Sequence, residues 1–266
     1  KILVMKCSHV SSPINIGSMT VKNRLVMPPM VRNYATTSGE VTERYIQHIK
    51  SIAQGGVGLM ILEASYISGE GKGFTNQLGI DKDKQITGLK KLAATAHQYE
   101  TKIGIQLYHA GRQTHHLVTG KQPVAPSPLA CPVNQDPPKK LTIGEIIELE
   151  NKFADAALRA QAADLDFVEI HAAHGYLITQ FLSPYSNKRN DKYGGNLENR
   201  FRFLKNIILK TKAVVGNNYP ITVRLTADEF SPGGLTIADT VKIAELLEKL
   251  NIHALHISAG NYGSYN

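Results

Sequence analysis

Short apolar runs alternate with amphipathic stretches along most of the chain. At residues 167–170, Phe-Val-Glu-Ile is largely apolar with a β-branched bias, which is typical of a strand buried in a parallel sheet. At residues 85–100, apolar side chains recur three or four positions apart and predict a helix with one buried face. The predicted strands are 25–27, 57–62, 102–107, 167–170, 221–225 and 254–258, and the predicted helices are 42–54, 85–100, 142–163, 198–215 and 236–250.

Two other segments have patterns of their own. Residues 13–23 alternate apolar and polar side chains around Gly17 and Ser18, which predicts a short hairpin. Residues 113–140 are rich in proline and have no period, so we expect a loop that crosses the surface. Thr142 and Glu145 have the spacing of a capping box that starts the next helix.

The alternation of strands and helices predicts a parallel α/β fold, either a doubly wound sheet or a (β/α)8 TIM barrel. The barrel is favoured because no G-x-G-x-x-G motif follows the first strand, and because polar clusters follow nearly every strand. With six predicted strands, we expect one domain, residues 1–266, forming a TIM barrel truncated after the sixth strand. Unless residues absent from this sequence close that barrel, the fold is not a barrel, because six strands leave open edges.

Composition narrows the classes of function. Hydrophobic residues make up 42% of the chain, and the formal net charge of +8 favours anionic partners. No Lys/Arg run with interleaved aromatic residues indicates a nucleic-acid surface, and no apolar segment is long enough to span a membrane. Cys7 and Cys131 are far apart, which fits free thiols and a cytoplasmic location. Open sheet edges would favour association with a partner chain, so a homo-oligomer is a candidate state.

Three side chains that can donate hydrogen bonds or protons directly follow the 167–170 strand. If a helical turn starts at His171, its imidazole and that of His174 share one face and can hold a carbonyl oxygen. Alternatively, the two histidines could pack in the core or bind a metal ion, although no third metal ligand is identifiable from spacing. We favour the functional interpretation because side chains at a strand end are more exposed than core residues. Tyr176 is a candidate general acid, or else a half-buried aromatic residue.

Other polar side chains occur at the ends of neighbouring strands. Gln106 lies near the end of the third strand and Arg224 near the end of the fifth. An inward-facing arginine is costly to bury without an anion, so Arg224 indicates either a negative ligand or an ion pair with Asp228 or Glu229. Arg112 either holds an anion or orders the loop that follows it.

Several of these segments together resemble the old yellow enzyme family, closest to the branch of NADH:flavin oxidoreductases that includes 2,4-dienoyl-CoA reductase. The resemblance covers residues 13–260. Its motifs are Lys22-Asn-Arg-Leu-Val-Met-Pro-Pro-Met, Gly104-Ile-Gln-Leu-Tyr-His-Ala-Gly-Arg, His171-Ala-Ala-His-Gly-Tyr-Leu-Ile, Gln180-Phe-Leu-Ser-Pro, Asn187-Lys-Arg-Asn-Asp-Lys-Tyr-Gly-Gly and Val223-Arg-Leu-Thr-Ala-Asp.

The resemblance implies a TIM barrel with FMN at its C-terminal mouth and NADH or NADPH as reductant. It implies that His171 and His174 hold the carbonyl oxygen of a small α,β-unsaturated carbonyl or thioester substrate. Hydride then passes from the flavin to the alkene while Tyr176 donates a proton. The cofactor-binding residues that it implies are Pro28, Pro29, Met30, Ala64, Gln106 and Arg224.

The chain departs from the family at its end, where the resemblance implies two further βα units that hold the FMN phosphate. We therefore expect weakened retention of flavin if the protein stops at Asn266. The other functions considered are a metal-dependent lyase or hydrolase that uses His171 and His174, and an inactive barrel fragment.

Overall fold

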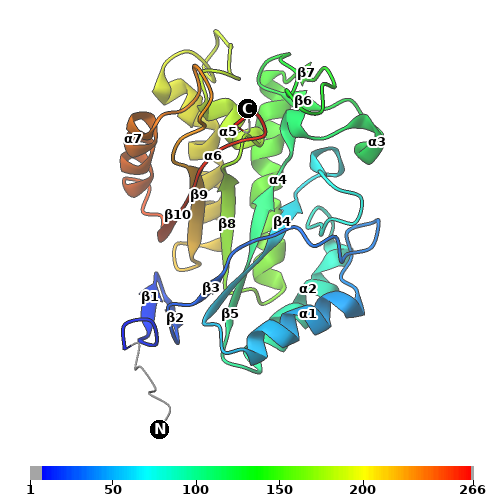
Figure 1. Ribbon diagram of the computed structural model, residues 1–266, viewed down its shortest axis with the longest axis vertical. Coiled ribbons are helices and arrows are strands. Elements are labelled where there is room, and N and C mark those ends of the chain that lie inside the picture. Colours follow the sequence, from blue (N-terminus) through cyan, green and yellow to red (C-terminus); the bar gives the residue numbers. More distant parts are fainter. Residues whose placement is uncertain (1–7, 265–266) are drawn as a thin grey trace.

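Six parallel strands form one sheet in the computed structural model, which describes residues 8–264. The spatial order is β10-β9-β8-β5-β4-β3, so each strand lies beside its neighbour in the chain, as in a barrel (Figure 1). All six predicted strands are present. Their bounds are β3 (Val26–Met27), β4 (Leu59–Tyr66), β5 (Lys102–Tyr108), β8 (Phe167–Ala172), β9 (Ile221–Thr226) and β10 (Ala254–Ser258).

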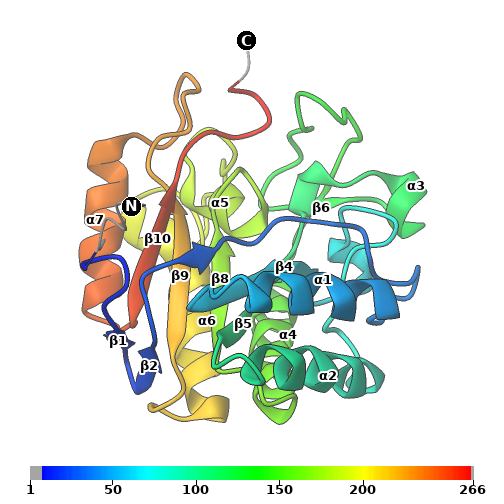
Figure 2. The same ribbon diagram turned by 60° about the horizontal axis from the view of Figure 1, so that its bottom comes forward.

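The long helices lie along one face of the sheet, as Figure 2 shows. Alternate strand residues such as Ile105, Ile170 and Val223 point to that face and join Leu149 and Phe203 of the helices in the main core. The predicted capping box is confirmed, because Thr142 accepts from the Glu145 amide and Glu145 from the Thr142 amide. The helices are α1 (Glu43–Gln54), α2 (Ile86–His97), α4 (Ile143–Ala162), α6 (Leu197–Val215) and α7 (Ile237–Glu248).

The predicted N-terminal hairpin is confirmed as β1 (Ile14–Ile16) and β2 (Met19–Val21). It lies at the amino ends of the sheet strands (Figure 1). Met19 and Val21 pack against Leu59 and Phe167 in a second apolar cluster. The hairpin therefore closes the bottom of the sheet and leaves the carboxyl ends of the strands as the open mouth.

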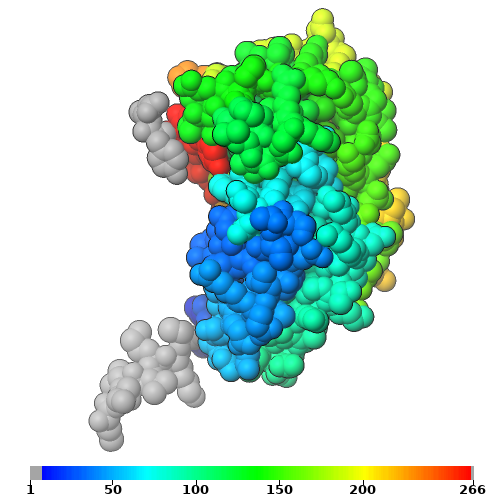
Figure 3. All heavy atoms as spheres, turned by 90° about the vertical axis from the view of Figure 1, so that its right-hand side faces the viewer, coloured from blue at the N-terminus to red at the C-terminus, as the bar shows by residue number. Residues whose placement is uncertain are grey.

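The sheet curls as a half barrel whose edges are β3 and β10. Figure 3 shows the resulting concave side, between the green and red segments above and the blue segments below. A cavity of about 400 Å³ lies within this curl and is lined by Val26, Pro28, Phe167, Glu169 and Ile257, among others. The expected barrel is thus present as a curled parallel arc of six strands.

Some local predictions were wrong. Residues 113–140, expected to be without regular structure, contain α3 (His116–Thr119), β6 (Val124–Ala125) and β7 (Lys139–Lys140). The short helix α5 (Leu177–Leu182) was not predicted, because all six of its side chains are buried and its sequence has no amphipathic period. Three turns of 3₁₀ helix are η1 (Gly69–Gly71), η2 (Asp83–Gln85) and η3 (Gly111–Gln113).

Strand β4 extends beyond the predicted residues 57–62 as far as Tyr66. A β-bulge interrupts its pairing with β5, because Leu62 pairs with Ile105 but Ala64 pairs with Gln106. Glu63 is the extra residue. Beyond the bulge, Ala64 and Tyr66 therefore face the inside of the curl, where they pack against Tyr108.

Two further predictions concern composition. Cys131 is a buried free thiol, as expected, whereas Cys7 lies outside the described residues. Between residues 8 and 264, no helix has both the length and the hydrophobicity that crossing a bilayer requires.

Candidate active site

His171 is the inward-facing side chain nearest the carboxyl end of β8. The expectation of a helical turn starting at this residue was wrong, since His171 lies within the strand. The expectation of exposure was also wrong, because the side chain is buried, with 3% of its surface accessible. The rings of Tyr108 and Tyr176 cover it, with centroids 5.8 Å and 5.0 Å from its own.

His174 is brought beside His171 by a sharp turn rather than by helical spacing. Its backbone is left-handed, with φ of 61°, and Gly175 continues the turn with φ of 74°. The His174 amide donates to Thr226 Oγ1 at 2.7 Å, which fixes the turn against β9. His174 Nδ1 lies 3.4 Å from His171 Nε2, and its Nε2 lies 2.6 Å from Ser258 Oγ.

Tyr176 begins α5 and directs its phenol toward the same point. Its ring meets Tyr108 edge to face at 4.6 Å, and its hydroxyl lies 3.2 Å from that of Tyr262. Burial raises the pKa of Tyr176, lowers that of His171, and lowers the pKa of His174 to about 4. At neutral pH, therefore, the phenol is protonated and both imidazoles are uncharged hydrogen-bond donors.

Arg224 faces the inside of the curl from β9, opposite His171 on one side and His256 on the other. Its Nε atom is buried without a hydrogen-bond partner. Among the described residues, the alternative ion pairs with Asp228 and Glu229 are not formed. Asp228 accepts from the Phe230 amide, and Glu229 from Ser183 and the Leu235 amide. A half-buried guanidinium whose buried Nε donor is unused fits an anionic or carbonyl-bearing ligand.

The sequence interpretation missed Glu169, a buried carboxylate in the middle of β8. Gln106 Nε2 donates to its Oε1 at 2.7 Å, and His256 Nδ1 lies 3.0 Å from its Oε2. The signal was available, because Phe167, Glu169 and His171 alternate along one strand and must share a face.

The remaining predicted residues lie on β4 and on the segment after β3. Ala64 pairs with Gln106 and is buried, so it lies on the same inner face. Pro28 lines the inner cavity together with Glu169, and Pro29 is buried. Met30 is 46% exposed and instead lines a small pocket with Arg32. The structure thus groups Ala64, Gln106, His171, His174, Tyr176 and Arg224 on one face, and Met30 lies apart from them.

Two further arginines have structural partners. Arg112 donates to the carbonyl oxygens of Leu129 and Ala130, so it orders the loop. Arg200 donates to the carbonyl oxygens of Leu182 and Gly195, so it joins α6 to the end of α5 and to the loop between them. The metal interpretation of His171 and His174 lacks a third ligand, because the one three-residue group of metal-binding character within residues 8–264 lies elsewhere.

Comparison with known proteins agrees with this geometry. The model of the NADH:flavin oxidoreductase / NADH oxidase family matches residues 10–264. An NADH oxidase from Thermoanaerobacter brockii is 49% identical over 94% of this chain, which spans 39% of that protein. An NADPH dehydrogenase from Geobacillus is 40% identical over 94% of this chain and 72% of its own length. The chain thus spans about two-fifths of the first of these relatives.

Solved structures show the same arrangement of strands. A 2-naphthoyl-CoA reductase in complex with 2-naphthoyl-CoA superposes with a TM-score of 0.93 at 32% identity, covering 96% of this chain and 41% of its own. An old yellow enzyme homologue from Zymomonas mobilis has a TM-score of 0.86 at 34% identity, covering 93% of this chain and 72% of its own.

Proposed function

On the premise that the chain belongs to the NADH:flavin oxidoreductase / NADH oxidase family, we propose that it forms the FMN-binding domain of an NAD(P)H-driven reductase of activated C=C bonds. The observation that carries this proposal is the meeting of two uncharged imidazoles, a protonated phenol and an unpaired guanidinium at one strand-end mouth. Such a site can polarise a bound carbonyl group through neutral hydrogen-bond donors, without a protonated imidazolium beside it.

The inner face fits a flat cofactor such as FMN, whose ring gains negative charge when it is reduced. Arg224 offers a buried donor and a positive charge for the electron-rich edge of the ring. Ala64 presents only a methyl group there, and Gln106 adds an amide whose donor side is held by Glu169. Pro28 would line the ring from the β3 side. When bound, FMN would supply the hydride chemistry of the reaction.

The chain's own residues would bind and protonate the substrate. His171 and His174 would donate hydrogen bonds to the carbonyl oxygen, which draws electron density from the alkene. Because burial keeps both imidazoles neutral, this polarisation does not depend on a titration near neutral pH. The phenol of Tyr176 would give its proton to the α-carbon as the β-carbon is reduced.

Relatives support the substrate and reductant classes. One structural neighbour is a complex of 2-naphthoyl-CoA reductase with 2-naphthoyl-CoA, and another is morphinone reductase in complex with tetrahydroNAD. We therefore propose a small α,β-unsaturated carbonyl compound or thioester as oxidant, and NADH or NADPH as reductant. The open edges of the sheet also support the proposal of a homo-oligomer.

The test starts with the purified chain and added FMN. Calorimetric titration should give one FMN per chain, with flavin absorbance that NADH or NADPH bleaches without oxygen. An enone or an enoyl thioester should then restore the oxidised spectrum, and the saturated product should form in equal amount. FMN that binds and is reduced, but is not reoxidised by either acceptor, would contradict alkene reduction. Failure to bind FMN at any concentration up to its solubility limit would contradict the cofactor assignment.

A further inference from the structure

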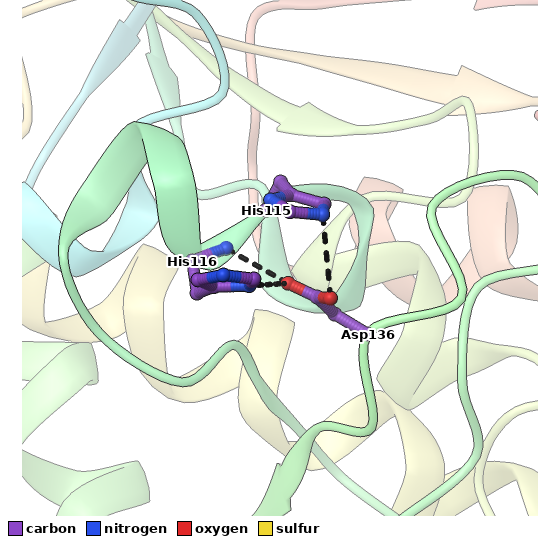
Figure 4. Close-up of side chains that lie close together, drawn as sticks. All are labelled: His115, His116 and Asp136. Atoms are coloured by element: carbon purple, nitrogen blue, oxygen red, sulfur yellow. Dashed lines mark hydrogen bonds and ion pairs between the residues drawn. The ribbon is translucent and has the colours of Figure 1, made fainter.

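Three side chains with metal-binding atoms meet above the sheet, on the loop that follows β5. His115 is the N-cap of α3, His116 is its first residue, and Asp136 comes from the far side of the same loop (Figure 4). His115 Nε2 lies 3.4 Å from Asp136 Oδ1, and His116 Nδ1 lies 2.9 Å from Asp136 Oδ2. Their ligand atoms all lie within 4.8 Å of one another.

Contacts around the cluster hold the carboxylate in place. The His116 amide donates to Asp136 Oδ2 at 2.8 Å, in addition to the contact from its ring. Only 15% of the Asp136 side chain is exposed, and the two imidazole rings lie 4.4 Å apart at 31°. The hydrogen bonds from the backbone and ring of His116 lower the pKa of Asp136, so the carboxylate is ionised at neutral pH.

We propose that His115, His116 and Asp136 bind one divalent transition-metal ion of the zinc type. Two imidazole nitrogens and one carboxylate oxygen are a common ligand set for such ions, with water in the fourth position. A tetrahedral ion with bonds of about 2.0 to 2.1 Å separates its ligand atoms by roughly 3.3 Å. The observed separations of 2.9 and 3.4 Å, which end on the two different oxygens of Asp136, lie near that spacing, and small side-chain shifts would bring all three ligand atoms from within 4.8 Å to that distance.

Binding requires a change of tautomer in both rings. His116 Nδ1 donates to the Asp136 carboxylate, so its proton must move to Nε2 when an ion binds at Nδ1. His115 Nδ1 accepts from the Leu117 amide at 3.2 Å, which leaves the ring proton on Nε2. An ion at Nε2 moves that proton to Nδ1, so the Leu117 amide must give up this hydrogen bond. We therefore expect micromolar rather than nanomolar affinity.

The position of the cluster gives the ion a structural consequence. It would link α3 to the segment around Asp136, across a loop of twenty residues. The same loop reaches the open mouth of the sheet, since Gln113 donates to the carbonyl oxygen of His174 at 3.0 Å. A bound ion should therefore stabilise the loop beside the mouth, whether or not FMN is present.

The experiment uses the full chain without an affinity tag, treated with a chelator, dialysed and titrated with ZnCl2 by calorimetry. We expect saturation at one Zn2+ per chain and a rise in melting temperature. Asp136→Asn and His115→Asn should each weaken binding by about tenfold or more. The asparagine Oδ1 takes the place of His115 Nδ1 and can still accept from the Leu117 amide, so the second variant removes the ligand with the cap retained.

His97→Asn is the matched control. His97 Nε2 lies 2.7 Å from Asp166, which makes an exposed imidazole–carboxylate pair without a second imidazole in contact. This variant should bind Zn2+ like the unaltered chain. The proposal is overturned if no one-to-one binding is seen, or if both cluster variants bind Zn2+ as tightly as the unaltered chain, which would place the ion elsewhere.

Discussion

The side-chain amide of Gln106 donates a 2.7 Å hydrogen bond to the buried carboxylate of Glu169. The family resemblance implies that Gln106 contacts the edge of FMN. In the structure, the hydrogen bond to Glu169 fixes the orientation of the Gln106 side chain. The second oxygen of Glu169 lies 3.0 Å from His256 on the edge strand β10. One carboxylate therefore orients side chains from strands on both sides of β8.

Glu169→Gln should weaken FMN binding. The new glutamine side chain has one acceptor oxygen for two donors, so either Gln106 or His256 loses its hydrogen-bond partner. This loss should lower the stability by about 1–3 kcal/mol. We expect about tenfold lower FMN affinity by calorimetry, equivalent to about 1.4 kcal/mol. Glu150→Gln is the control, because Glu150 is also buried and accepts from Tyr193 and Asn206 but lies on α4. Equal FMN affinities in the two variants would refute the orienting role of Glu169.

Tyr176→Phe should separate the two half-reactions. Reduction of bound FMN by NAD(P)H should be nearly unchanged, whereas alkene reduction should slow by about 100-fold or more, because the proton donor is missing. Anaerobic stopped-flow absorbance measures both rates. Tyr219→Phe provides the comparison, since that buried hydroxyl donates to Leu165 at the opposite end of the strands. Equal slowing of both half-reactions by Tyr176→Phe would remove Tyr176 from the proton-donor role.

Arg224→Met should affect the cofactor more than the fold. Without FMN, the loss of a buried donor that has no partner should leave the free energy of unfolding unchanged, or raise it by up to about 1 kcal/mol. FMN at 100 times its Kd should stabilise the original chain by about 2.7 kcal/mol. The same FMN concentration should stabilise the variant much less, as measured by urea unfolding.

Arg112→Met gives the opposite expectation. It removes the donor to the carbonyl oxygens of Leu129 and Ala130, so it should lower stability and keep the gain from FMN. If Arg224→Met retained the full FMN stabilisation, Arg224 would not contact the cofactor.

Stability should fall in mild acid because of the buried histidines. An unfolded histidine binds a proton near pH 6.5, whereas His174 in the folded chain does so only near pH 4. The unfolded state therefore binds more protons between these values, and the free energy of unfolding decreases as pH falls from 6.5 toward 4. Urea unfolding at several pH values measures the slope. His174→Asn should make it shallower, and an unchanged slope would contradict a depressed pKa for His174.

Much of the fold could be predicted because the strands are short, mainly apolar runs separated by amphipathic helices. The helix predicted over 198–215 is present from Leu197, and Asn196 caps it by accepting from the Asn199 amide. The bulge at Glu63 could not be predicted, because the sequence Leu-Glu-Ala-Ser does not indicate which residue of the neighbouring strand each of these residues pairs with. Residues 113–140 were underestimated because their short elements are stabilised by contacts with distant parts of the chain, such as the bond from Thr114 to Lys72.

The sequence predicted which side chains meet at the candidate site better than it predicted how they are arranged there. His171 and His174 are neighbours as expected, but through a strand end and a left-handed turn, and the burial of His171 depends on Tyr108, which is far away in the sequence. Ser258 and Tyr262 also contact this pair and Tyr176. No local motif marks those two residues, because only the curl of the sheet brings β10 and the segment after it to the mouth.

The extra residue in β4 decides which side chain the mouth receives. Because a strand alternates faces with every residue, a regular strand without the bulge would pair Glu63 with Gln106 and send Ala64 toward the helices. The space above Gln106 would then hold a carboxylate in place of a methyl group. The fit of this wall to a flat ring therefore depends on where the bulge falls in β4 as much as on which side chains the strand carries.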